Sequence, residues 1–380
     1  MANLRYTPGR RLRDAVLSLA RRRVLLAVVS MAVAAFAAGS TLAADIPSTL
    51  ERPAGAAPLR YRDAIFDDVR VTRDLQYGRA PGPDGESEAL LLDLYEPAGD
   101  AEAERPVLVW VHGGGYSYGD KGRGPSAEMA EKFARHGYVT VSINYRLLVK
   151  GGCDGQGQVP MECLTAAVEA IHDAQAAVRW LRANAGAHRI DPERIGIGGE
   201  SAGAITAVGV GIIADQPGES GNSGYPSDVN AWVSISGGIP AGIFIDSSDA
   251  PGLLFAGTAD QVVPYVWSVQ TAEAFQRAGV AVYLQTLDGA GHVPWEQYQE
   301  LFETQSNYLF YELLDVDRSA KLAEATADPV ATPAAALPST GSRAIEPQEA
   351  LPLVLTFLAA LAIAAVIAWV RKREMDGARN

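Results

Sequence analysis

A serine between two nearby glycines is the side chain best suited to covalent chemistry in this sequence. The segment Gly199-Glu200-Ser201-Ala202-Gly203 follows a β-branched run and precedes small apolar residues at helical spacing. It therefore predicts a strand, a sharp turn that carries Ser201, and a helix. Glycines without a Cβ let the strand and the helix approach each other, which leaves the serine Oγ exposed. This pattern predicts that the hydroxyl of Ser201 attacks a carbonyl carbon as a nucleophile.

A serine hydroxyl is a weak nucleophile near neutral pH and needs a positioned base. The chain has five histidines, and His292 lies in a glycine-bearing loop after the strand expected at residues 281–286. That loop can return the imidazole over the carboxyl edge of the sheet, where Ser201 is expected. We therefore predict that His292 is the base. Surface, structural or loop-shaping roles are expected for the others, which are His112, His136, His172 and His188.

An acid must fix the tautomer of the imidazole and stabilise its charged form. Asp260 follows the strand expected at residues 253–256, so it should reach the same edge of the sheet. Asp246 and Asp249 precede that strand, and Asp288 is only four residues from His292. We therefore predict that Asp260 is the acid.

The oxyanion that forms during such an attack needs hydrogen-bond donors. The run His112-Gly113-Gly114-Gly115 directly follows a buried strand expected at residues 107–111. Successive glycines let backbone N–H groups converge without interference from side chains, and the N–H of Ala202 approaches from the start of the helix. The sequence thus predicts an oxyanion-binding loop after this strand.

Strand-like and helix-like segments alternate through the region that must position these groups, residues 45–318. The alternation predicts a mostly parallel sheet with helices on both faces, an antiparallel beginning and at most a small lid. The expected strands are 69–77, 90–95, 107–111, 139–145, 195–198, 231–236, 253–256 and 281–286, and the expected helices are 127–136, 164–185, 202–214, 267–278 and 295–314.

Residues from about 90 to 314 resemble the α/β-hydrolase esterases with an H-G-G-G oxyanion motif, a broad group that contains hormone-sensitive-lipase-like, carboxylesterase-like and feruloyl/acetylxylan-esterase-like enzymes. The resemblance rests on residues 112–115, 199–203, 257–264 and 291–292, and on the order of Ser, Asp and His. It implies an α/β-hydrolase fold, no cofactor, and oxyanion donors at the amides of Gly114, Gly115 and Ala202. No helical cap is apparent before residue 90, and the insertions of type-B carboxylesterases are absent, so we expect an open site.

These observations predict a serine ester hydrolase that acts on short acyl chains or on esters linked to polysaccharides. Two alternatives remain: a serine peptidase of the prolyl-oligopeptidase type, and a catalytically silent hydrolase fold used for adhesion. The glycine loop and the lack of a propeller-sized N-terminal domain count against the peptidase, and the intact Ser201, Asp260 and His292 count against the adhesion module. A formal charge of −13 disfavours nucleic-acid binding.

The N-terminal residues 1–44 are expected to be an export signal. Arg21-Arg22-Arg23 precede a fifteen-residue apolar run at 24–38, and small residues suitable for cleavage follow. The arginines also resemble a twin-arginine signal, but we favour the general secretory route.

The C-terminal residues predict attachment to the cell surface. An Ala/Pro/Thr-rich linker at 319–350 contains the sequence LPSTG at 337–341, and the uncharged segment 351–370 can span a bilayer before the basic, cytoplasmic tail 371–380. This succession resembles a sortase sorting signal, with cleavage after Thr340. The alternative is a plain C-terminal membrane anchor, and surface display follows from both.

The chain has two cysteines, Cys153 and Cys163. In an exported chain we expect them to form a disulfide that closes the loop after the strand at 139–145. The alternative is two buried free thiols. A metal site is not expected, because no His or acidic cluster lies beside them at ligand spacing.

Overall fold

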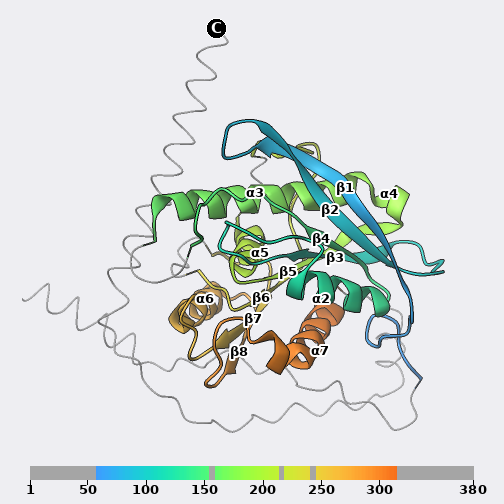
Figure 1. Ribbon diagram of the computed structural model, residues 1–380. Helices are drawn as coiled ribbons and strands as arrows, with labels where there is room; N and C mark the ends of the chain where they lie inside the picture. The colour runs from blue at the N-terminus through green and yellow to red at the C-terminus, as the bar shows by residue number, and fades with distance from the viewer. Residues whose placement is uncertain (1–56, 154–158, 214–217, 240–244, 315–380) are drawn as a thin grey trace, which may run out of the picture. The chain divides into compact units, whose positions relative to one another are not determined.

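The computed structural model describes residues 57–153, 159–213, 218–239 and 245–314 (Figure 1). The predicted export signal at 1–44, linker at 319–350, membrane segment at 351–370 and tail at 371–380 lie outside these residues and stay predictions. Among the helices that the structure describes, none is both long and apolar enough to cross a membrane.

An eight-stranded sheet forms the centre of the described region, with the strand order β1-β2-β4-β3-β5-β6-β7-β8 (Figure 1). Strand β2 pairs antiparallel with both β1 and β4, and all other pairs are parallel. The expected antiparallel beginning and mostly parallel sheet are therefore confirmed. The strands are β1 (Val69–Pro81), β2 (Ser87–Pro97), β3 (Arg105–Val111), β4 (Val139–Ile143), β5 (Ile190–Glu200), β6 (Ala231–Ile235), β7 (Gly252–Gly257) and β8 (Val282–Leu287).

Helices cover both faces of the sheet. Every residue of strand β3 is buried, so both faces of the sheet need helices packed against them. Val109 packs into one core with α3, α5 and α6, and Trp110 packs into the other core with α2 and α7. A strand buried on both faces reads as a continuous apolar run. The helices are α2 (Gly124–Arg135), α3 (Met161–Ala183), α4 (Ala185–His188), α5 (Ala202–Ile212), α6 (Tyr265–Ala278) and α7 (Trp295–Leu313).

The element types agree with the sequence, but several boundaries differ. The helix expected at 164–185 ends at Ala183, and the short helix α4 was not predicted. This helix ends at His188, because the next residue, Arg189, has a φ of 51°, in the left-handed region that cannot continue a helix. Strand β5 begins earlier than expected because Ile190 pairs with Arg105 ahead of a register shift in the ladder to β3.

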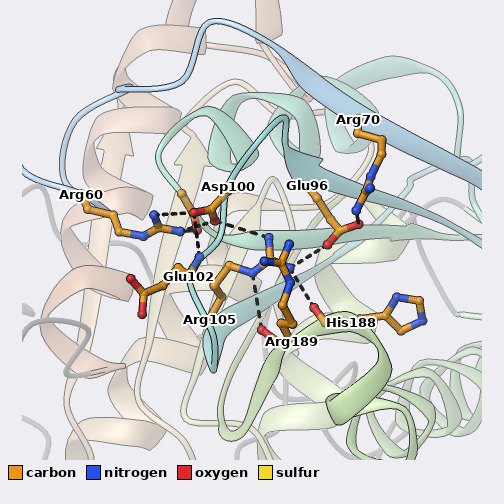
Figure 2. Close-up of polar contacts among 9 residues, drawn as sticks. Arg60, Arg70, Glu96, Asp100, Glu102, Arg105, His188 and Arg189 are labelled. Carbon is orange, nitrogen blue, oxygen red and sulfur yellow. Dashed lines mark hydrogen bonds and ion pairs between the residues drawn. The ribbon is translucent and has the colours of Figure 1, made fainter.

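A charged cluster lies at the amino end of β3, the edge of the sheet opposite the predicted chemistry (Figure 2). The fully buried Arg105 contacts Glu96 at 2.6 Å and Asp100 at 3.5 Å, and it donates to the carbonyls of His188 and Arg189. Burial opposes ionisation of Glu96, but hydrogen bonds from Arg105 and Arg70 lower the pKa of this carboxyl below its usual value. The cluster ties β2, β3 and α4 together and has a structural role.

The disulfide between Cys153 and Cys163 is confirmed, with a Cα–Cα distance of 5.8 Å. The backbone N–H of Cys153 donates to the carbonyl of Gly115, so the disulfide also touches the glycine loop. Replacement of both cysteines by serine is expected to lower the free energy of unfolding by about 2–3 kcal/mol, because the unfolded chain regains the entropy of an open loop. Urea denaturation measures this change. An unchanged midpoint and slope in the double variant would contradict it.

Candidate active site

Ser201 occupies a strained turn between β5 and α5. Its φ of 55° and ψ of −121° are unusual for a residue with a side chain. The flanking glycines are required by close contacts: a Cβ on Gly203 would lie 2.0 Å from the carbonyl oxygen of Val111, and one on Gly199 would lie 2.6 Å from that oxygen. The chain can therefore make this turn only with glycine at both positions.

The structure brings the three predicted catalytic side chains together. His292 Nε2 lies 2.8 Å from Ser201 Oγ, and His292 Nδ1 lies 2.8 Å from Asp260 Oδ2. The carboxylate of Asp260 is 2% exposed and the imidazole of His292 is 20% exposed. The histidine can therefore exchange a proton with the serine while one side of the ring remains open to solvent.

Backbone groups hold the acid and the base in place. The other carboxylate oxygen of Asp260 accepts hydrogen bonds from the N–H groups of Val262 and Val263, at 2.8 and 2.9 Å. After His292, the chain turns sharply at Val293, whose φ is 42° and whose N–H donates to Ser236 Oγ. All these residues follow the carboxyl ends of β6, β7 and β8, which explains how segments far apart in the sequence converge.

The rival residues lie elsewhere or have other partners. Asp246 and Asp249 hydrogen-bond to each other's backbone, and Asp288 accepts a hydrogen bond from Thr258. His136 contacts Glu303, His172 contacts Glu169, and His188 packs on Trp180. His112 contacts the carbonyl of Gly113 at 2.7 Å and stacks on Tyr145, as a loop-shaping residue should.

The glycine loop that follows β3 is held by a dense set of contacts. The N–H of Gly113 donates to Glu200 Oε1 at 3.0 Å, and Gly114 and Gly115 have φ values of 110° and 55°. The Tyr145 hydroxyl donates to the carbonyl of His112, and the Tyr116 hydroxyl donates to the carbonyl of Ala202. The amide of Gly113 thus already has an acceptor, and Gly113 is not among the predicted oxyanion donors, which are Gly114, Gly115 and Ala202.

Sequence reasoning missed Glu200, Tyr116 and Tyr145 as supports of this loop. Glu200 lies within the nucleophile motif and Tyr116 directly follows the glycine run, and those positions were the available signal. Tyr145 lies at the end of the segment expected as a strand, two residues beyond the observed end of β4, and had no comparable signal. Its role depends on the parallel pairing of β3 and β4, which aligns the loops after both strands.

Burial raises the pKa of Glu200 to about 7, against the opposing effect of hydrogen bonds from Ser126 and Gly113. The folded protein then binds this proton more tightly than the unfolded chain. The contribution of Glu200 to the free energy of unfolding should therefore fall by about 2–3 kcal/mol between about pH 5 and about pH 8. Urea unfolding of the wild type and of Glu200→Gln at both pH values measures this fall in the free energy of unfolding. We expect the fall to be smaller in the variant. Equal pH dependence in both proteins would contradict this assignment.

Comparison with known proteins supports an esterase-like region around these loops. A family model described as BD-FAE matches residues 92–239, less than half of the chain. The match includes the glycine loop and Ser201 but not Asp260 or His292.

Phenmedipham hydrolase of Pseudarthrobacter oxydans is 38% identical over 163 residues, which are 41% of this chain and 30% of that protein. Lipase 2 of Geotrichum candidum is 30% identical over 152 residues, 39% of this chain and 25% of that lipase. The matches thus span less than a third of the length of either relative.

Solved structures extend the likeness to most of the described region. A truncated carbohydrate esterase from gut microbiota superposes with a TM-score of 0.52 at 20% identity, covering 67% of this chain and 98% of that one. Native esterase 2 of Thermogutta terrifontis gives 0.53 at 23% identity, covering 69% and 98%. At such identities the likeness concerns the fold. Together with the strand order, it shows that residues 57–314 have the α/β-hydrolase fold.

Proposed function

We propose that this protein is a serine carboxylic-ester hydrolase. The observation that carries the proposal is a pair of contacts within hydrogen-bond distance. His292 lies 2.8 Å from Ser201 Oγ on one side and 2.8 Å from Asp260 Oδ2 on the other. A nucleophile, a base and a residue that orients the base in this geometry are the parts that acyl transfer needs. The similarity to phenmedipham hydrolase and to lipases supports an ester as the substrate.

The first half of the reaction transfers the acyl group to the protein. Ser201 Oγ attacks the ester carbonyl carbon while His292 Nε2 accepts the hydroxyl proton. Asp260 accepts a hydrogen bond from Nδ1 and stabilises the imidazolium that forms. The amides of Gly114, Gly115 and Ala202 stabilise the negative oxygen of the tetrahedral intermediate. Its collapse breaks the ester C–O bond, and His292 returns the proton to the leaving alcohol.

The second half of the reaction regenerates the serine. Water takes the place of the alcohol, and His292 removes a proton from it as it attacks the acyl carbon. Collapse of this second intermediate breaks the bond between the acyl carbon and Ser201 Oγ, and His292 returns the proton to the serine. The carboxylic acid then leaves.

The test of this function is hydrolysis of a p-nitrophenyl ester series of increasing acyl length, with a peptide p-nitroanilide measured in parallel. We expect turnover of the short esters, a steep fall in kcat/KM beyond them, and little cleavage of the anilide. No turnover of any ester by the folded protein would overturn the proposal. Anilide cleavage that exceeds ester cleavage would favour the peptidase.

A carbohydrate-linked ester is the substrate that we favour, and Tyr118 supports it. Among the large hydrophobic side chains that the structure describes, that of Tyr118 is the most exposed, with 69% of its surface accessible to solvent. A Cβ placed on Gly114 would lie 3.1 Å from Tyr118 Cδ2, so the ring borders the glycine loop. An exposed aromatic face beside the glycine loop can stack on a sugar ring.

Tyr118→Ala is expected to raise KM for an acetylated xylo-oligosaccharide by roughly fivefold, since a stacking contact contributes about 1 kcal/mol. KM for p-nitrophenyl acetate should change less, because that ester has no sugar to stack. Tyr225→Ala is the matched control, as Tyr225 is 44% exposed and lies outside the loops that carry the site. Steady-state kinetics on both substrates measure the effect. An equal change of KM for both esters would count against a sugar-binding role.

We further propose that the enzyme acts outside the cell, attached through its C-terminal segment. The disulfide supports an oxidising compartment. The basic and apolar residues before position 44 support export, and the LPSTG sequence followed by 351–370 supports either sortase attachment at Thr340 or a plain membrane anchor. Mass analysis of the mature C-terminus distinguishes these two, because only sortase cleavage ends the chain at Thr340.

A further inference from the structure

The side chain of Glu200 connects the nucleophile turn to the glycine loop. Glu200 is the last residue of β5 and directly precedes Ser201, and it is 6% exposed. One carboxylate oxygen accepts the N–H of Gly113 at 3.0 Å. The other accepts the hydroxyl of Ser126, which is buried in α2. A single carboxylate thus bonds to the loop after β3 and to the helix that follows this loop.

The loop and the turn are also in direct contact at this point. A Cβ placed on Gly113 would lie 3.0 Å from the carbonyl oxygen of Glu200 and 3.1 Å from the Cβ of Ser201. The position of the loop relative to Ser201 is therefore sensitive to small shifts of Gly113. The hydrogen bond from its N–H to Glu200 opposes such shifts, together with the contacts of its carbonyl to His112 and Tyr145.

We propose that Glu200 is a positioning residue that fixes the glycine loop in register with Ser201. By accepting the N–H of Gly113, it sets the orientation of the peptide groups that follow. The amides of Gly114 and Gly115 are then left to bind the oxyanion. The inference rests on the proposed esterase function and adds a residue to the same site.

This role affects the transition state more than the bound substrate. Oxyanion donors bond most strongly to the charged oxygen of the tetrahedral intermediate, so a displaced loop should lower kcat and leave KM nearly unchanged. Loss of the carboxylate would also leave the part-buried N–H of Gly113 without its acceptor, which favours a shifted loop.

The wild type and three variants test the inference, with short p-nitrophenyl esters as substrates. Glu200→Met fills a similar volume without an acceptor, and we expect kcat to fall by roughly 10- to 100-fold with KM within about threefold. Glu200→Gln keeps an oxygen for the N–H of Gly113 and should retain kcat within about threefold. Ser126→Ala removes the other partner of Glu200 and should behave like the wild type.

An alkyl boronic acid supplies a second readout, because it forms a tetrahedral adduct with Ser201. Its inhibition constant should rise in Glu200→Met by about the factor by which kcat falls. If that variant does not fold, Glu200→Asp replaces it: the shorter side chain draws the carboxylate away from Gly113, so kcat should fall while Glu200→Gln remains active.

Two results would overturn the inference: a kcat in folded Glu200→Met equal to that of the wild type, or equal losses in Glu200→Gln and Glu200→Met. Failure of the proposed function looks different. In that case the wild type itself would turn over none of the esters.

Discussion

Ser201→Ala is expected to lower kcat for a short p-nitrophenyl ester by roughly 10⁶-fold. The variant removes the proposed nucleophile, because Ser201 Oγ lies 2.8 Å from His292 Nε2. KM should change little, because the hydroxyl contributes little to binding of the ground-state ester. The remaining rate should be the small enhancement that an oxyanion site and bound substrate give without a nucleophile.

The fold of this variant should be intact. Alanine retains the Cβ that the strained turn already accommodates, and the N–H at position 201 still donates to the carbonyl of Ile235 at 2.9 Å. A circular dichroism spectrum and a urea midpoint like those of the wild type provide the control. Residual turnover above about 1% of the wild type would show that another group is the nucleophile.

Asp260→Asn should lower kcat by roughly 10⁴-fold in a folded protein. The amide oxygen can still accept the N–H groups of Val262 and Val263, so the local backbone is preserved. The amide NH₂ would then face His292 Nδ1 and favour the tautomer with its hydrogen on Nε2. That tautomer cannot accept the proton of Ser201, and no carboxylate stabilises the imidazolium.

The matched control is Asp246→Asn, at a rival carboxylate that bonds to Ser248 in an exposed turn. It should retain the kcat of the wild type. Stopped-flow or steady-state ester hydrolysis distinguishes the two variants. Similar losses in both, or a loss below about tenfold in Asp260→Asn, would mean that Asp260 does not orient the base.

Local patterns were sufficient to predict most of the architecture and the three side chains that meet at the candidate site. Alternation and flanking turn residues identified β1 and β2, whereas a continuous apolar run identified β3, which is buried on both faces. Ser201, Asp260 and His292 were predictable because each follows the carboxyl end of a parallel strand, and such ends meet at one edge. The disulfide needed only the two cysteines of the chain.

Contacts that depend on side-chain direction could not be predicted. Glu200 accepts a hydrogen bond from Gly113, 87 residues earlier, and its place in the nucleophile motif does not show which partner it has. Arg105 precedes the strand expected at residues 107–111, and the sequence does not show that it is fully buried and paired with Glu96 and Asp100. These partners follow from the register of neighbouring strands, which hydrophobic periodicity does not encode.

The most direct test of the account is to treat the wild type with paraoxon and locate the label by peptide mass mapping. Attack by Ser201 Oγ on phosphorus releases p-nitrophenolate and leaves a diethylphosphoryl group on the serine. We predict one such group per chain, on the peptide that contains Ser201, slower labelling of Asp260→Asn, and none at that peptide in Ser201→Ala. A folded wild type that takes up no label, or a label at the same peptide in Ser201→Ala, would contradict a nucleophilic Ser201.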